Sequence, residues 1–469
     1  MWNKIESLLQ FALNKQMIEP EDLIWARNQL LAYLKISAGD VDMTRFGKTD
    51  PSYDNCENAV CIIEALIDDY ASRGLMSDDS ASARDRMEAG LMNLLMPRPS
   101  ELTAAFWEKY ANSKTSATDY FYNLCKASNY IQMERLKKNI KWLASTKYGD
   151  LEITINLSKP EKDPRDIAAA RMERTSSYPK CLLCAENVGF EGTSSKPARQ
   201  NLRTVPITLD NENWYLQYSP YLYYNEHCIV FNQLHTPMRL TDRTFYKLIG
   251  FLKDFPHYFV GSNADLPIVG GSILSHDHFQ GGRHTFPLDN AEVYAEYRHP
   301  KYPDVSIGQV AWPLSVIRLT LTESADESKL ANLAFYILEC WRKYSDPEAE
   351  IYAFTGDTPH NTITPIARRK NGRLEMDLVL RNNRTTDEYP FGLFHPHPEW
   401  HHIKKENIGL IEVMGLAILP GRLHSVLEAK ELSRQEIERV FLNVLIDCGV
   451  FKDTDTGRKQ FRRFIEYFV

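Results

Sequence analysis

The chain is organised around residues 270–282, which read Gly270-Gly271-Ser272-Ile273-Leu274-Ser275-His276-Asp277-His278-Phe279-Gln280-Gly281-Gly282. Two glycine pairs bracket an alternating run. If residues 273–280 form a strand, its two-residue period places His276, His278 and Gln280 on one face and Asp277 on the other. The glycines let the backbone approach a ligand closely, and their N–H groups can bind phosphate oxygens. This combination favours a reactive site over histidines that merely cap a sheet edge.

Length and composition indicate a large globular protein. Because 469 residues exceed the size of one ordinary core, two or three domains are expected. The net charge of -7 provides no basic surface for nucleic acid or for an anionic membrane. No apolar run reaches the ~18 residues of a membrane span, and the start of the chain lacks the layout of a signal peptide. We therefore expect a cytoplasmic protein.

The eight cysteines are scattered, except for the pair Cys181 and Cys184. A disulfide framework is not expected in a chain this long, so the pair is either half of a metal site or a redox motif. The residues around it do not suggest the strand and helix of a redox domain. A closed tetrahedral zinc needs two more ligands, for which we choose His235 and His276. His227 is the rival ligand, and a surface role for either chosen histidine remains an alternative.

The first 148 residues have helical spacing, and their lysine-rich part, residues 119–142, is interpreted as a solvated helix face. Residues 151–157 alternate cleanly and form the first clear strand, so the class of structure changes near Gly149. Strands at 214–218 and 227–231, a helix after Thr241 and the histidine-bearing strand follow. This order predicts an open antiparallel unit with its site at a strand end.

A similar order of elements returns from about residue 305. Residues 315–321 alternate, residues 329–344 are helical, and residues 362–369 pair with residues 374–381 across the turn Asn371-Gly372. We therefore predict an α+β protein with a helical segment, 1–148, and two related units, 149–304 and 305–469.

His278 is the predicted nucleophile. Neutral imidazole attacks phosphorus well when one ring nitrogen is unprotonated and the other donates to a fixed acceptor, which we expect to be a backbone carbonyl. Attack on the α-phosphorus of a nucleotide gives a nucleotidyl-histidine, which a second phosphate can reverse. The amide of Gln280 can donate a hydrogen bond to a phosphoryl oxygen but cannot deliver a proton. A sugar phosphate leaving group needs no proton, so the site favours exchange between phosphates.

The loop after residue 157 holds two lysines three residues apart, Lys159 and Lys162. Loops at strand ends are common ligand sites, so both lysines are candidate phosphate contacts. Taken alone, such a pair is more often part of the surface.

Several segments together resemble the galactose-1-phosphate uridylyltransferase family, a branch of the histidine-triad superfamily, and in particular its second, bacterial class. The resemblance covers nearly the whole chain and rests on the motifs within 96–100, 119–122, 137–142, 155–164, 263–272 and 403–415. The first class has His-Pro-His-x-Gln where this chain has Asp277 in place of the proline. The resemblance implies two histidine-triad-like units with open antiparallel sheets.

The resemblance also implies roles for individual residues. His278 becomes the uridylylated nucleophile with Gln280 as its partner, and the zinc ligands of the first class match Cys181, Cys184, His235 and His276. Substrate contacts are implied or proposed for Lys159, Lys162, Asn263, Gly270, Gly271, Ser272, Arg283 and Lys405. His395 and His397 lie where the first class has two ligands of a second, iron site. Its other ligands do not map cleanly onto this chain, so the presence of a second metal stays open.

The activity implied is exchange of UMP between UDP-glucose and galactose 1-phosphate, which yields glucose 1-phosphate and UDP-galactose in galactose catabolism. The resemblance implies a homodimer, with a structural zinc and with neither nucleic acid nor membrane as partner. Two rivals remain at this point: a histidine-triad nucleotide hydrolase and a non-catalytic, zinc-stabilised nucleotide-binding module.

Overall fold

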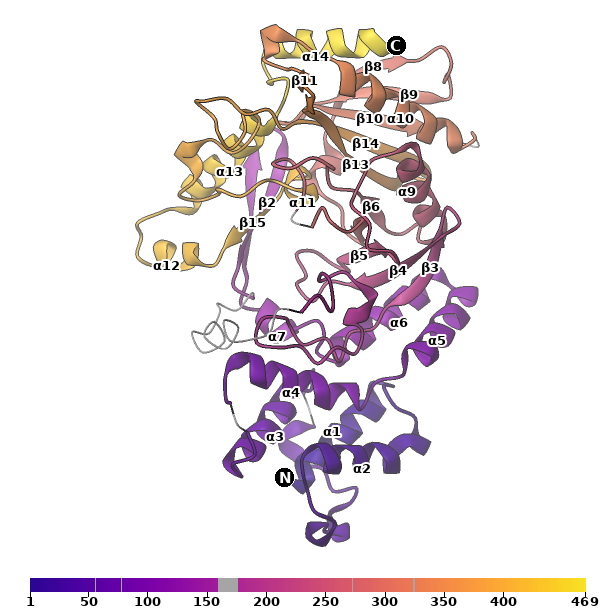
Figure 1. Ribbon diagram of the computed structural model, residues 1–469, viewed down its shortest axis with the longest axis vertical. Helices are drawn as coiled ribbons and strands as arrows, with labels where there is room; N and C mark the ends of the chain where they lie inside the picture. Colours follow the sequence, from indigo (N-terminus) through magenta and orange to yellow (C-terminus); the bar gives the residue numbers. More distant parts are fainter. Residues whose placement is uncertain (55, 77, 159–175, 272, 324) are drawn as a thin grey trace. The chain divides into compact units, whose positions relative to one another are not determined.

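The computed structural model describes the chain except for residues 55, 77, 159–175, 272 and 324 (Figure 1). Lys159, Lys162 and Ser272 therefore lie outside the described residues. The chain forms two compact units. One comprises residues 1–137, 158–207 and 215–222, and the other comprises residues 138–157, 208–214 and 223–469.

The first unit is mainly helical, as predicted for the start of the chain. Its helices are α1 Trp2–Asn14, α2 Leu23–Tyr33, α3 Val60–Ser72, α4 Ala81–Asn93, α5 Pro99–Asn112, α6 Lys114–Ala127 and α7 Met133–Leu136. The apolar face of α1 is buried, including Ile5 and Leu8. A disulfide joins Cys56 to Cys61 just before and within α3. The sequence does not predict this pairing, because its cysteines indicate no disulfide framework.

The helical part ends earlier than expected. Residues 140–146 form strand β1, Ile140–Thr146, which pairs with β2, Gly149–Asn156. The interpretation of residues 119–142 as a helix face is therefore wrong from Ile140 onward. The physical reason is an alternation that the lysines obscure: Ile140 and Trp142 pack against the core, while Lys141 points away. Strand β15, Leu416–Pro420, adds to β2 in parallel and completes a three-stranded sheet.

A large antiparallel sheet dominates the second unit. Eight of its strands follow the order β5-β7-β6-β13-β14-β10-β9-β8. Their bounds are β5 Cys228–Asn232, β6 Phe259–Gly261, β7 His278–Gly282, β8 Val293–Arg298, β9 Val305–Val310, β10 Val316–Leu321, β13 Asn361–Lys370 and β14 Arg373–Asn382. The remaining strands are β3 Val205–Leu209, β4 Glu212–Tyr218 and the short hairpin of β11 Phe354–Thr355 with β12 Thr358–Pro359.

The sheet contains the repeat that the element order predicts. In the first copy the chain runs through β5, helix α9 (Asp242–Asp254), β6 and β7, and its strands lie in the sheet in the order β5-β7-β6. In the second copy the chain runs through β10, helix α10 (Ser328–Lys343), β13 and β14, and its strands lie in the matching order β10-β14-β13. The two copies join where β6 pairs with β13. The predicted hairpin between β13 and β14 turns at Asn371 and Gly372, both with positive φ, as its turn chemistry requires.

Helices α9 and α10 lie side by side against the sheet (Figure 1). The hydroxyl of Tyr246 on α9 donates to Asn332 on α10 at 2.8 Å. The three-stranded sheet contributes to a shared core with α11 (Leu410–Val413) and α13 (Arg434–Cys448), which also buries Ile366 and Val379 of the large sheet. Helices α12, Arg422–Glu428, and α14, Asp455–Phe468, complete the carboxyl-terminal part.

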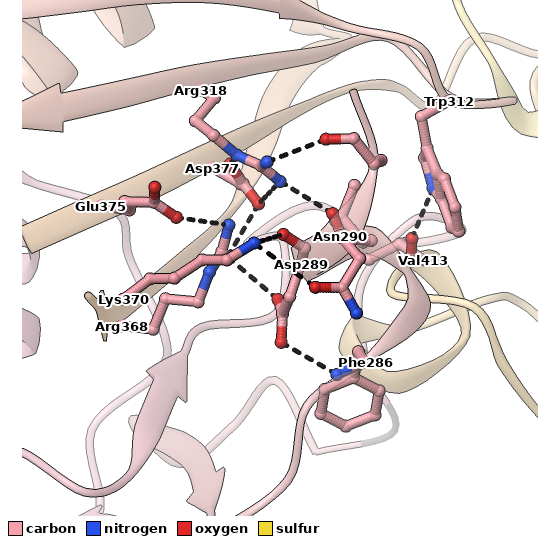
Figure 2. A network of polar contacts seen from close by, with 12 residues as sticks. Phe286, Asp289, Asn290, Trp312, Arg318, Arg368, Lys370, Glu375, Asp377 and Val413 are labelled. Carbon is pink, nitrogen blue, oxygen red and sulfur yellow. Dashed lines mark hydrogen bonds and ion pairs between the residues drawn. The ribbon is translucent and has the colours of Figure 1, made fainter. Parts of the chain in front are cut away.

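Two arginines and three carboxylates form a buried ion network in the second copy (Figure 2). Arg318 on β10 donates to both carboxylate oxygens of Asp377 on β14, at 2.7 and 2.9 Å. Arg368 on β13 contacts Asp377 at 2.8 Å, Asp289 at 3.1 Å and Glu375 at 3.0 Å. Burial alone would raise the pKa of Asp377, but the two guanidinium groups hold it below its ordinary value. The network fixes the turn containing Asp289 to the sheet.

Candidate active site and metal centre

Strand β7 begins at His278, not at residue 273 as the alternation suggests. Residues 273–277 form an irregular turn that ties back to the end of β5, because Asp277 N–H donates to Thr236 O and Asn232 N–H donates to Asp277 O. His276 is therefore positioned by a turn and not by the face of a strand, and one of its ring nitrogens lies 2.8 Å from Asn232 O. The expectation that one strand face presents all three polar groups is wrong for His276.

His278 has the environment that a neutral nucleophile needs. Its Nδ1 lies 2.8 Å from the carbonyl oxygen of His276, so Nδ1–H donates and Nε2 keeps its lone pair. Burial lowers the pKa of His278 to about 4. A backbone carbonyl is the acceptor that the sequence predicts for this ring. The imidazole is therefore neutral near pH 7, with one defined tautomer.

Gln280 lies on the same face of β7 as His278, two residues further along. Its Oε1 is 3.2 Å from Nε2 of His227, the residue just before β5. His227, the rival metal ligand, thus contacts Gln280. This contact is not predicted from the sequence, although a pairing of the two predicted strands, 227–231 and 273–280, would have been the signal for it.

The two halves of the predicted metal site have suitable local geometry. Cys181 Sγ and Cys184 Sγ are 3.5 Å apart, and the side chain of Asn187 donates to the carbonyl oxygens of both cysteines at 2.8 Å. The rings of His235 and His276 have centroids 4.9 Å apart. Among the described residues, these two cysteines and two histidines form a group that could hold a metal ion.

The glycines before the turn are required by the packing of their own loop. A Cβ on Gly270 would lie 2.4 Å from Ala264 O, and one on Gly271 would lie 2.6 Å from Nδ2 of Asn263. Asn263 is buried, and its Oδ1 accepts from Leu410 N–H at 2.9 Å, at the start of α11. Asn263 therefore ties the glycine loop to the carboxyl-terminal part of the second unit.

Two of the predicted substrate contacts, Arg283 and Lys405, are basic residues outside the glycine loop. Nε of Arg283 is 3.1 Å from Oε1 of Glu226, which neutralises part of its charge. Lys405 is exposed, with Nζ 5.4 Å from the ring centre of Phe391, whereas the neighbouring Lys404 is buried against Glu412 at 2.9 Å. The side chain of Lys405 is thus free to reach a ligand, and that of Lys404 is not.

His395 and His397 do not belong to the metal-ligand group found among the described residues. Nε2 of His395 lies 3.1 Å from Oδ1 of Asn407, and Nδ1 of His397 lies 3.5 Å from Oδ2 of Asp447. Each histidine therefore has a polar partner of its own.

Asp277, for which the sequence provides no role, is partly buried in the turn before β7. Burial raises its pKa to about 6, and the charges of Lys247 on α9 and of Glu212 act on it in opposite directions. Lys247 itself pairs with Glu212 at 2.7 Å. Asp277 therefore belongs to a small charged cluster near α9 and not to the reactive face.

Comparison with known proteins identifies the relatives of this chain. Two family models match, the amino-terminal domain of galactose-1-phosphate uridyl transferase over residues 50–237 and its carboxyl-terminal domain over residues 251–442. Among characterised sequences, galactose-1-phosphate uridylyltransferase of Caldanaerobacter subterraneus is 48% identical over 98% of this chain and 97% of its own. The same enzyme of Clostridium acetobutylicum is 48% identical over 99% of each chain.

Among solved structures, yeast Ap4A phosphorylase Apa2 aligns over 74% of this chain and 94% of its own. Its TM-score of 0.37 and sequence identity of 14% are too low to support a comparison of folds. The matches of both family models and the near-complete coverage at 48% identity establish that this chain belongs to the galactose-1-phosphate uridylyltransferase family.

Proposed function

We propose that this protein is a UDP-glucose:hexose-1-phosphate uridylyltransferase that works by double displacement through a uridylyl group on His278. The observation that carries this proposal is the hydrogen bond from Nδ1 of His278 to the carbonyl oxygen of His276 at 2.8 Å. It leaves Nε2 as an unprotonated nucleophile. Family membership supports the same reaction class.

In the first half-reaction, Nε2 of His278 attacks the α-phosphorus of UDP-glucose. The bond from that phosphorus to the bridging oxygen breaks, and glucose 1-phosphate leaves with the electron pair. In the second half-reaction, a phosphate oxygen of galactose 1-phosphate attacks the uridylyl phosphorus. UDP-galactose forms, and His278 regains its lone pair. Neither leaving group requires a proton, which suits Gln280, since its amide can only donate a hydrogen bond.

The substrate contacts remain proposals. The backbone N–H groups of Gly270 and Gly271, with Ser272, would bind phosphoryl oxygens, together with Lys159, Lys162 and, less directly, Arg283. Asn263 would lie near the nucleotide and Lys405 near the sugar phosphate. The exposure of Lys405 is compatible with this role.

We also propose that Cys181, Cys184, His235 and His276 bind one zinc ion. Two thiolates and two imidazoles are a complete tetrahedral donor set for zinc. A site of this kind has no open position for substrate, so the ion would be structural. The ion would fix the turn that bears His276, and it would thereby help to position His278, two residues further on.

We further propose a cytoplasmic homodimer acting in galactose catabolism, with a helical segment, 1–148, and two uridylyltransferase units, 149–304 and 305–469. No helix among the described residues has the length and apolarity needed to cross a membrane.

The test is to incubate the protein with UDP-glucose labelled in the uridine. A labelled peptide containing His278, whose label galactose 1-phosphate removes as UDP-galactose, is the expected result. His278→Ala should take up no label, whereas His424→Ala, a change on the surface helix α12, should label normally. Free UMP as the main product would favour a hydrolase. Nucleotide binding with neither labelling nor UMP would favour a binding module.

A further inference from the structure

We propose that His227 is a positioning residue that holds the Gln280 side chain in one orientation, with its amide NH₂ directed to the phosphoryl group. The inference deepens the proposed function and rests on it, because it concerns how Gln280 acts there. An amide presents an acceptor or a donor to the substrate depending on a 180° rotation. A neighbouring group must therefore fix which of the two rotations the Gln280 amide adopts.

The register of the sheet brings His227 and Gln280 together. Ile229 on β5 pairs directly with Gln280 on β7, and His227 lies two residues before Ile229. Residues two apart on a strand share a face, so His227 is the diagonal neighbour of Gln280. Nε2 of His227 lies 3.2 Å from Oε1 of Gln280, and the His227 side chain is buried.

The His227 ring also packs against neighbours other than Gln280. Its centroid lies 4.6 Å from the ring of Tyr224, whose hydroxyl donates to Gly281 O at 3.2 Å. The preceding residue, Glu226, has a φ of 54° and accepts a hydrogen bond from Tyr258 at 2.6 Å. These contacts restrict the position of the His227 ring.

The directly paired residue on the other side of Gln280 has no side chain that could compete for its amide. Gly261 on β6 pairs with Gln280, and a side chain there would collide with Leu410, since a Cβ would lie 2.7 Å from its Cδ1. The proposal places the proton of His227 on Nε2, which can then donate only to the carbonyl oxygen of Gln280. With Oε1 engaged, the NH₂ group is directed away from His227, and its hydrogen bond is available to a phosphoryl oxygen in both half-reactions.

The decisive experiment is a double-mutant cycle of His227→Phe and Gln280→Ala, measured as single-turnover rates of uridylyl-enzyme formation and discharge. Phenylalanine keeps an aromatic ring beside Tyr224 but removes the donor. We expect His227→Phe alone to lower both saturating rates by about 5- to 10-fold, the size of one neutral hydrogen bond, with little change in KM. When Gln280 is already replaced by alanine, His227→Phe should cause no further loss of rate. A merely structural role predicts the same loss in both backgrounds, and that result would overturn the inference.

Two more variants keep the test decisive if His227→Phe is poorly folded. His227→Gln retains an N–H donor and should recover most of the rate, whereas His227→Leu should not; equal rates for the two would also overturn the inference. Tyr246→Phe on α9 is the matched control, because it loses one hydrogen bond remote from Gln280, and it should keep the wild-type rates. A separate result, no rate loss in Gln280→Ala alone, would instead refute the proposed role of Gln280.

Discussion

Gln280 and Asp377 lie in the same cross-strand row of the large sheet. Gln280 pairs with Gly261, Gly261 pairs with Ile366, and Ile366 pairs with Asp377. Directly paired residues share a face. The face that carries the proposed reactive pair in the first copy of the repeat thus carries the buried ion network in the second copy, on β14, the counterpart of β7. The second copy has charges locked by Arg318 and Arg368 where the first has a nucleophile and its partner.

The first prediction concerns stoichiometry. Because this face of the second copy is occupied by an ion network, each chain should carry one uridylyl group at most. Mass spectrometry of the intact protein after reaction with UDP-glucose should detect a single uridylyl addition. His278→Ala should abolish it, and a second addition would contradict the assignment of one reactive copy.

The second prediction concerns the metal. Cys181→Ser replaces a thiolate ligand with a hydroxyl, a poor ligand for zinc, so bound zinc measured by atomic emission should fall from about one ion per chain to near zero. The midpoint of thermal unfolding should fall as well. Cys340→Ser alters a partly exposed cysteine outside the ligand group and should keep the metal. Unchanged zinc in Cys181→Ser would exclude the proposed site.

The third prediction concerns the glycine loop. In Gly271→Ala the new methyl group would meet Asn263, which holds Leu410 N–H, so the free energy of unfolding should fall by about 1–3 kcal/mol. Gly250→Ala is the matched control, because its Cβ has no neighbour within 4 Å and the residue lies inside helix α9. The free energy of unfolding of Gly250→Ala, measured in urea, should rise by about 0.5–1 kcal/mol. Equal effects of the two changes would show that the loop has room for a side chain.

The fourth prediction concerns pH. Burial raises the pKa of Glu88 on α4 to about 7; nearby Asp85 acts in the same direction, while Asn129 and Arg135 oppose it. Since this pKa exceeds the ordinary value of 4.5, the folded state binds the proton more tightly than the unfolded state. The resulting stability is complete below about pH 4.5 and is lost as the pH rises through about 7.

Glu88→Gln keeps the hydrogen-bonding shape without the charge, so its thermal unfolding midpoint should fall less than that of the wild type between pH 5 and pH 8. Glu108→Gln, a change at an exposed position of α5, should follow the wild-type profile. Parallel profiles for the wild type and Glu88→Gln would contradict the assignment.

The sequence predicts elements whose signal is local. The hairpin at Asn371-Gly372, helices α9 and α10, and the carbonyl acceptor for His278 all follow from short-range patterns or from the chemistry of one side chain. Strand β1 is missed because Lys141 and the two lysines just before the strand match a solvated helix face as well as a strand. The contact of His227 with Gln280 is missed because strand register joins residues 53 positions apart, and periodicity within one segment cannot reveal it.

The ion network is missed for the same reason. Arg318 and Asp377 are 59 residues apart, and each looks like an ordinary surface charge in its own strand. Their burial follows from the three-stranded sheet and the turn at Asp289, which cover this face of the second copy. The fold class is therefore accessible from the sequence, whereas the partner of a buried charge is not.

The acceptor that fixes the tautomer of His278 is a main-chain oxygen. Every amino acid supplies one, so no substitution at residue 276 removes the acceptor itself. The ring orientation therefore depends on the path of the chain through residues 273–277, which the proposed zinc ligand His276 would help to fix, and a substitution at residue 276 acts on the ring only through that path. Insertions or deletions in this turn should disable the nucleophile even when every polar side chain of the motif is retained.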